Sequence, residues 1–132
     1  MGKVKSVGQT KDTGWQFGIR RSVPFNINEV WDFLFSENGT QLWLKGADKE
    51  FSTFKNLSHI RTKWKLKDWT NEATLQMRLI ANKDKTTIAF HIENLCDERQ
   101  REETKAYWNT VIETIIEKIT TSDSEILAGK NH

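Results

Sequence analysis

The most regular hydrophobic pattern in the chain lies near its C-terminus, where apolar residues recur at helical spacing. After Asp97, Glu, Lys and Arg residues fill one helical face, and the other face carries Trp108, Val111, Ile112, Ile115 and Ile119. A stripe with a period of about 3.6 residues has to bury against another element. We therefore predict an amphipathic helix over residues 98–120, capped by Asp97, with a flexible polar tail at 121–132.

Four earlier segments instead show the alternation of apolar and polar residues that is typical of strands. In the last of them, for example, Ile88, Phe90 and Ile92 are separated by Ala89 and His91. All four are apolar on one side only, which favours an antiparallel sheet with one solvated face. The predicted strands cover residues 14–22, 59–66, 72–81 and 86–95.

Two short helices are predicted between the first and second of these strands. Asn26 followed by Glu29 has the form of a capping box, which marks a helix N-terminus. Asn38-Gly39 is expected to end this helix, and residues 42–44 suggest a second one. The segment 45–58 has few large apolar residues, and no regular element is assigned to it.

Four short motifs add a family resemblance to this pattern. They are Arg21-x-Val23-Pro24 leading into Val30-Trp31, Gly39-x-x-x-Trp43-Leu44, Ser58-His59-Ile60-Arg61-x-Lys63-Trp64 and Tyr107-Trp108-x-x-x-Ile112. The chain resembles START-like (SRPBCC, birch-pollen-allergen-like) domains, and most closely the homologues of the activator of the ninety-kilodalton heat-shock-protein ATPase. This resemblance implies one α+β domain over residues 14–120, with a helix-grip fold in which a curved antiparallel sheet wraps a long C-terminal helix. Residues 1–13 are predicted to be a flexible N-terminal segment.

One departure from the family pattern concerns the segment between the second helix and the Ser-His-Ile-Arg strand. Family members usually carry two more strands there, whereas this chain has only residues 47–57. Either those strands are reduced to one short segment, or the cavity is more open on that side.

Composition and charge exclude several classes of function. The chain has 132 residues, enough for one domain, and its 20 basic and 18 acidic residues are interspersed, which argues against nucleic-acid binding. No apolar stretch approaches the ~20 residues needed to span a bilayer. The single cysteine, Cys96, excludes an intramolecular disulfide and favours a reducing compartment. We expect a soluble cytoplasmic protein in which Cys96 is a small buried residue.

No motif for catalysis, for a metal or for a cofactor is predicted. His91-Ile92-Glu93 followed by Cys96 resembles part of a zinc-deaminase signature, but the partner motif P-C-x-x-C is missing. Alternation also places His91 and Glu93 on the solvated face. We interpret His91 as a surface histidine and expect no enzyme activity.

Large aromatic and apolar side chains from several elements are predicted to converge beneath the last helix. They are core residues, the lining of a ligand cavity, or both at once: Trp31, Phe35, Trp43, Trp64, Met77, Phe90, Trp108 and Ile112. Strict alternation turns Arg21 toward the same face, where it is a candidate polar anchor for a ligand carboxylate unless it reaches water at the strand end. Trp69 lies outside the alternation and is predicted to be exposed, as a contact candidate.

These observations support two hypotheses about function. The first is a non-catalytic binding module that holds a small apolar molecule between the sheet and the last helix. The second, which follows from the family resemblance, is a co-chaperone-like domain that binds a chaperone and stimulates its ATPase. The resemblance implies that family members acting this way normally carry an additional N-terminal domain, and this chain has room for only one domain.

Overall fold

The computed structural model describes residues 9–10 and 14–130, and the side chains of residues 14–121. Most of the predicted flexible segment 1–13 lies outside the described residues. Its residues Gln9–Thr10 form a short strand, β1, which pairs with the next strand. Within the described part of the chain, no helix is both long and apolar enough to cross a membrane.

The described strands form one antiparallel sheet in the order β1-β2-β6-β5-β4-β3. The long strands agree with the predicted segments: β2 spans Gly14–Val23, β4 His59–Trp64, β5 Ala73–Asn82 and β6 Lys85–Leu95. The predicted pairing of the last two strands is confirmed, since a tight turn at Lys83 and Asp84 joins β5 to β6.

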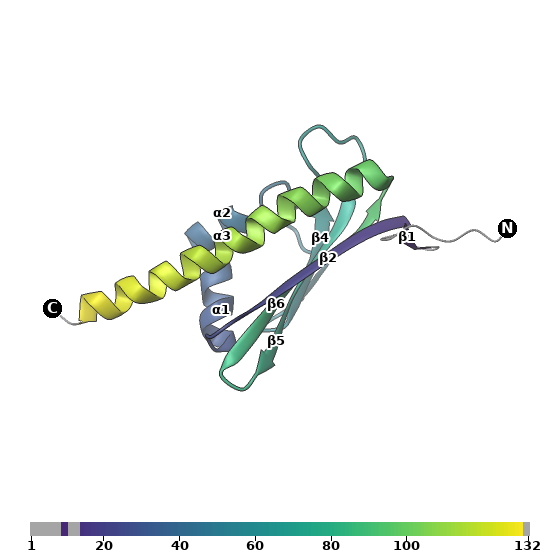
Figure 1. Cartoon of the computed structure of the whole chain (residues 1–132). Helices are drawn as coiled ribbons and strands as arrows, with labels where there is room; N and C mark the ends of the chain where they lie inside the picture. The colour runs from purple at the N-terminus through teal and green to yellow at the C-terminus, as the bar shows by residue number, and fades with distance from the viewer. Residues whose placement is uncertain (1–8, 11–13, 131–132) are drawn as a thin grey trace.

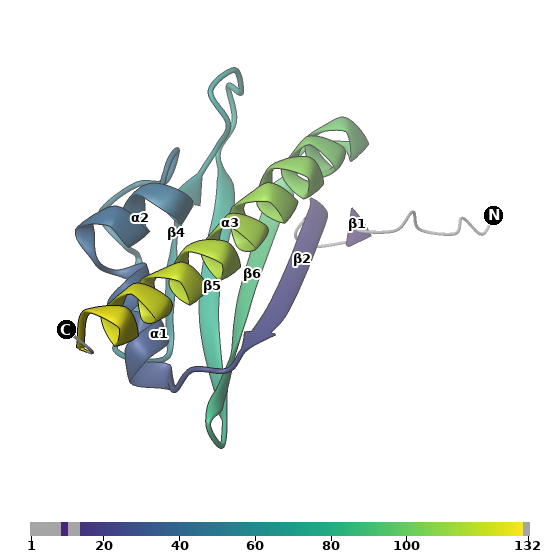
Figure 2. The ribbon, with the colours of Figure 1, turned by 60° about the vertical axis from the view of Figure 1, so that its left-hand side comes forward.

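One face of this sheet is covered by the long helix α3, Glu98–Lys130, which runs diagonally across the strands (Figures 1 and 2). Trp108 and Ile112 are buried beneath it, as the helical stripe predicts. The predicted α+β helix-grip architecture is therefore confirmed. The helix does not end near residue 120, however. It continues to Lys130, so the expected polar tail begins as helix.

Two short helices follow β2, as predicted, but their boundary differs from the prediction. α1 spans Ile27–Leu34 and begins with the expected capping box, because Glu29 N–H donates to Asn26 Oδ1 at 2.9 Å. α2 spans Glu37–Trp43, so Asn38-Gly39 lies in its first turn instead of ending α1. Ser36 is the N-cap of α2. A Cβ at position 39 would collide with the Phe33 carbonyl oxygen, so Gly39 serves the close approach of the two helices.

The unassigned segment between α2 and β4 keeps only one short strand. This is β3, Thr53–Lys55, which pairs with β4 at the end of the sheet. A further single bridge joins Ala47 to Trp64. Of the two alternatives for this segment, the structure matches strands reduced to one short element.

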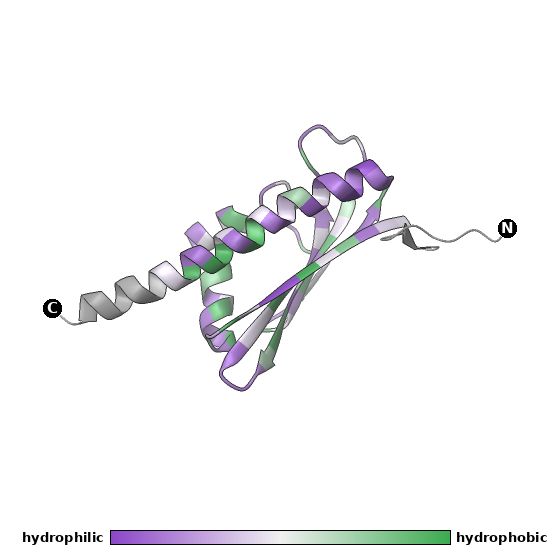
Figure 3. Cartoon of the chain, in the orientation of Figure 1, coloured by the Kyte–Doolittle hydropathy of each residue, from purple (hydrophilic) through white to green (hydrophobic). Residues whose placement is uncertain are grey.

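The core lies between the sheet and the three helices. Cross-strand pairs such as Met77–Phe90 and Leu75–Ile92 put apolar residues of neighbouring strands on the same inner face. Figure 3 shows the matching hydropathy, with hydrophobic residues on the central strands and the middle of α3. Each such large side chain contributes roughly 1.5–3 kcal/mol through its burial, which fixes α3 against the sheet.

Candidate functional site

Nearly all of the predicted cavity residues are packed in the core. Phe35 is half-buried, and the others are at most 6% exposed: Trp31, Trp43, Trp64, Met77, Phe90, Trp108 and Ile112. The structure brings these side chains together from α1, α2, three strands and α3. Their role in lining a ligand stays a prediction.

The packed rings form a continuous series of contacts through the core. Phe35 lies against Trp43, with ring centroids 5.5 Å apart. Trp43 in turn lies 5.9 Å from Phe90, and Phe90 lies 4.6 Å from Trp108. Trp108 also contacts Trp64, at 5.5 Å. The series therefore connects the region beside α2 with the centre of the sheet–helix interface.

The indole N–H groups of this series differ in their hydrogen bonding. Trp43 Nε1 donates to the Leu34 carbonyl oxygen at 2.8 Å, and Trp64 Nε1 donates to the Lys45 carbonyl oxygen at 3.2 Å. Trp108 Nε1 is buried and has no acceptor among the described residues. Such unpaired donors are rare in folded proteins, because a buried polar group without a partner costs free energy.

An open hollow of about 700 Å³ lies beside α2, at the half-buried end of this series. We call it the aromatic hollow; it is lined by Phe35, Thr40, Gln41, Leu44, Lys45, Lys49 and Phe51. Its apolar surface comes from the end of α1, the end of α2 and the shortened segment before β3. Only Phe35 belongs to the predicted cavity residues, so the hollow lies outside the predicted volume between sheet and α3.

Four aromatic rings gather between α1 and the shortened segment. Phe51 and Phe54 are stacked, with centroids 6.2 Å apart and planes 6° from parallel. Phe35 lies 6.1 Å from Phe54, and Trp31 lies 5.7 Å from it. Phe54 nevertheless remains 55% exposed. Phe51 and Phe54 were visible in the sequence as large apolar residues, but no periodic pattern marked them as part of a site.

Arg21 does not point into the core. It pairs with Ile88 across the strands, so it lies on the inner face as alternation predicts. Its side chain is 43% exposed, and its guanidinium lies 3.4 Å from the Glu113 carboxylate on α3. Arg21 therefore links β2 to α3 at the rim and does not line the aromatic hollow.

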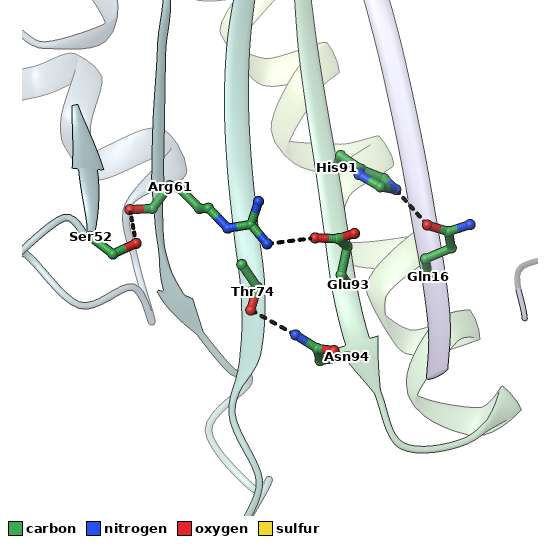
Figure 4. A network of polar contacts seen from close by, with 7 residues as sticks. All are labelled: Gln16, Ser52, Arg61, Thr74, His91, Glu93 and Asn94. Atoms are coloured by element: carbon green, nitrogen blue, oxygen red, sulfur yellow. Dashed lines mark hydrogen bonds and ion pairs between the residues drawn. The ribbon is translucent and has the colours of Figure 1, made fainter. Parts of the chain in front are cut away.

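The solvated face of the sheet carries a polar network, shown in Figure 4. His91 lies 2.9 Å from Gln16, and Arg61 donates to Glu93 at 3.0 Å. The predicted placement of His91 and Glu93 on this face is confirmed. No group of three His, Cys, Asp or Glu residues lies close enough together to hold a metal ion within the described part of the chain.

Two predictions about single residues are wrong. Trp69 is buried, because its loop folds onto α3 and its indole N–H donates to Glu103 at 3.0 Å. Cys96 is exposed, because it follows the end of β6 where the chain turns into α3. Partial desolvation and then the adjacent Asp97 raise the pKa of the Cys96 thiol.

Within the described part of the chain, two other groups have a clearly shifted pKa. Partial desolvation, with the positive charges of Arg78 and Lys55, lowers the pKa of His59. Half-burial raises the pKa of Tyr107. Neither of these residues lines the aromatic hollow.

Comparison with solved structures identifies the architecture. CalU16 from Micromonospora echinospora matches with a TM-score of 0.66 at 14% sequence identity, over 88% of this chain and 89% of that one. This chain has the helix-grip fold. PFC0360w, an HSP90 activator from Plasmodium falciparum, shares the fold with a TM-score of 0.65 at 17% identity, over 82% of this chain and 97% of that one. The predicted resemblance is thereby confirmed at the level of the fold.

A third helix-grip structure is larger than this chain. DynU16, a protein of the dynemicin biosynthetic locus, matches with a TM-score of 0.69 at 15% identity over 81% of this chain. The chain spans only about half, 48%, of the DynU16 chain. No protein-family model and no curated protein matches the sequence.

Proposed function

We propose that this helix-grip chain is a binding module that holds a small apolar molecule in the aromatic hollow and does not turn it over. The observation that carries the proposal is the hollow itself, whose volume is about 700 Å³ and whose walls include Phe35, Leu44 and Phe51. Small-molecule sites typically have volumes of roughly 300–1,000 Å³ and apolar walls with a few polar groups.

The packing behind the hollow supports this role. Phe35 contacts the ligand in our proposal, while Trp43, 5.5 Å away, forms part of the rigid wall. Preorganised walls reduce the entropy lost on binding. The indole N–H of Trp108, which has no acceptor among the described residues, lies further along the same series of rings and offers a donor to any polar atom that reaches the interior.

The distribution of ionisable groups supports binding without chemistry. Catalytic acids and bases typically have shifted pKa values inside a cleft. Among the described residues, a clear pKa shift is found for His59, Cys96 and Tyr107, and none of them lines the aromatic hollow. We therefore propose no catalytic residue.

Calorimetry and thermal unfolding with neutral apolar probes, 2-naphthol and decanol, test the proposal. Binding should raise the melting temperature as probe concentration rises, because the probes bind only the native state. Phe51→Ala should weaken binding about tenfold, since it removes an aromatic wall. Ile80→Ala is the matched control, because Ile80 is also an exposed apolar residue, at 43%, but lies outside the hollow. Absence of any binding, or equal loss in both variants, would refute the site.

A second candidate is the co-chaperone-like role, and the exposed ring of Phe54 favours it. Phe54 lies on β3, the last strand of the sheet, where a partner protein could contact it. The helix-grip protein PFC0360w is described as an HSP90 activator. Stimulation of a purified chaperone ATPase by this chain, lost in Phe54→Ser but not in Ile80→Ser, would support this role over the first.

A further inference from the structure

Two lysines bring positive charge to one side of the aromatic hollow. Lys45 follows α2 and Lys49 lies in the segment before β3, and both side chains are exposed. Neither forms an ion pair with another described residue. Their charges are therefore available to a molecule that enters the hollow.

The acidic residues near Lys49 do not line the hollow. Asp48 and Glu50 flank it in the chain, but the lining contains no carboxylate among the described residues. The Asp48 carboxylate instead accepts the backbone N–H of Glu50 at 3.0 Å. The charge that lines the hollow is consequently of one sign.

The hollow is thus amphipathic. Phe35, Leu44 and Phe51 provide an apolar surface, and the polar residues of the lining include the two lysines. An uncharged apolar molecule would contact the apolar surface but would leave the two lysines without a partner of opposite charge. A molecule with an apolar body and one anionic end would satisfy both, because its charge complements the lysines while its body covers the rings.

We propose that the aromatic hollow binds an amphipathic carboxylate, with its apolar body against Phe35, Leu44 and Phe51 and its carboxylate at Lys45 and Lys49. The inference rests on the proposed function, since it assigns the class of ligand to the same hollow. Ion pairs exposed to water are weak individually. Two lysines together should favour the carboxylate over a neutral molecule of the same shape by about 2- to 30-fold at low salt.

The test compares 2-naphthoate with 2-naphthamide, which has the same ring system and no charge. Dissociation constants from calorimetry should favour 2-naphthoate, and the preference should shrink between about 50 mM and about 500 mM NaCl because salt screens exposed charges. In the double variant Lys45→Gln/Lys49→Gln the preference should disappear while 2-naphthamide binds as before. The matched control is Lys85→Gln/Lys105→Gln, which removes the same charge from exposed positions outside the hollow and should keep the preference.

The outcomes separate this inference from the proposed function. If both probes bind with equal affinity, or if the preference survives Lys45→Gln/Lys49→Gln, the amphipathic-carboxylate inference is wrong while the binding module stands. If neither probe binds, both are wrong. If 2-naphthoate binds preferentially but Phe51→Ala leaves its affinity unchanged, the anion sits elsewhere and the inference is overturned.

Discussion

The indole ring of Trp108 on α3 lies against the phenyl ring of Phe90 on β6, with the ring centroids 4.6 Å apart and the planes tilted by 36°. Both side chains are almost completely buried. This contact joins the long helix to one of the central strands of the sheet. The loss of stability when this contact is removed therefore shows how much it contributes to holding α3 on the sheet.

Truncation of Trp108 should destabilise the protein severely. We expect Trp108→Ala to lower the free energy of unfolding by roughly 3–5 kcal/mol, because it removes a large buried aromatic side chain and leaves a cavity. Lys105→Ala, at an exposed position of the same helix, should change it by less than about 0.5 kcal/mol. Urea titrations measure both. Similar values for the two variants would mean that α3 does not depend on this contact.

A comparison of Trp43 with Trp108 tests whether the indole N–H of Trp108 lacks a hydrogen-bond partner. Both are fully buried, but Trp43 Nε1 donates to the Leu34 carbonyl oxygen whereas Trp108 Nε1 has no acceptor in the described structure. Trp43→Phe loses a hydrogen bond and leaves a carbonyl oxygen without it, so it should cost about 1–2 kcal/mol more than Trp108→Phe. Chemical denaturation of the two variants makes the comparison. A larger cost for Trp108→Phe would indicate that its N–H has a partner in solution.

The lowered pKa of His59 predicts a pH dependence of stability. Partial desolvation, Arg78 and Lys55 disfavour the protonated ring in the folded state relative to the ordinary histidine pKa of 6.5. Between pH 6.5 and the lowered pKa, the unfolded chain therefore binds more protons at this residue than the folded chain does. The folded state loses stability as the pH falls through this window, whereas His59 causes no change in stability above pH 6.5. His59→Gln should lose less stability over this window.

Unfolding titrations from about pH 5 to about pH 8 follow this difference. The free-energy gap between His59→Gln and the unsubstituted protein should be constant above the ordinary histidine pKa and change below it. An NMR titration of the His59 ring gives an independent value. A midpoint above 6.5 would reverse the expected sign.

The exposed Cys96 thiol should react without denaturant, but slowly. Partial desolvation and the charge of Asp97 raise its pKa above the ordinary value of 9.0, so little thiolate is present at neutral pH. Asp97→Asn should accelerate the reaction with a disulfide reagent, since it removes the neighbouring charge and keeps a helix-capping side chain. Glu98→Gln is the control for the loss of one acidic residue. Equal acceleration in both variants would show that net charge controls the rate.

The sequence determined the parts of the fold that depend on local periodicity. Strand alternation places a residue on one face or the other regardless of its distant neighbours, so the inner-face positions of Met77 and Phe90 and the outer-face position of His91 followed from the pattern. The helical stripe through Trp108 and Ile112 had to bury against the sheet. The capping box at Asn26 is likewise a local interaction.

For residues outside the alternating strands and the helical stripe, only the tertiary structure decided which groups surround them. Trp69 is buried because a loop reaches Glu103, 34 positions away in the chain, and Cys96 is exposed at the turn from β6 into α3. The sequence predicts that Gly39 ends a helix. In the structure it lies within α2, and its lack of a Cβ lets α2 approach the Phe33 carbonyl group closely. The role of each depends on contacts that no local pattern encodes.

The aromatic hollow illustrates the same division. Its apolar walls come from Phe35, Leu44 and Phe51, which belong to three segments without a common period. Amino-acid type identified them as large and apolar, but their convergence depends on the angle between α1 and α2 and on the short path from α2 to β3. These are properties of packing over long sequence distances. The sequence pattern predicted the strands and helices, and the family resemblance implied the helix-grip arrangement, but only the tertiary structure decided where the hollow lies.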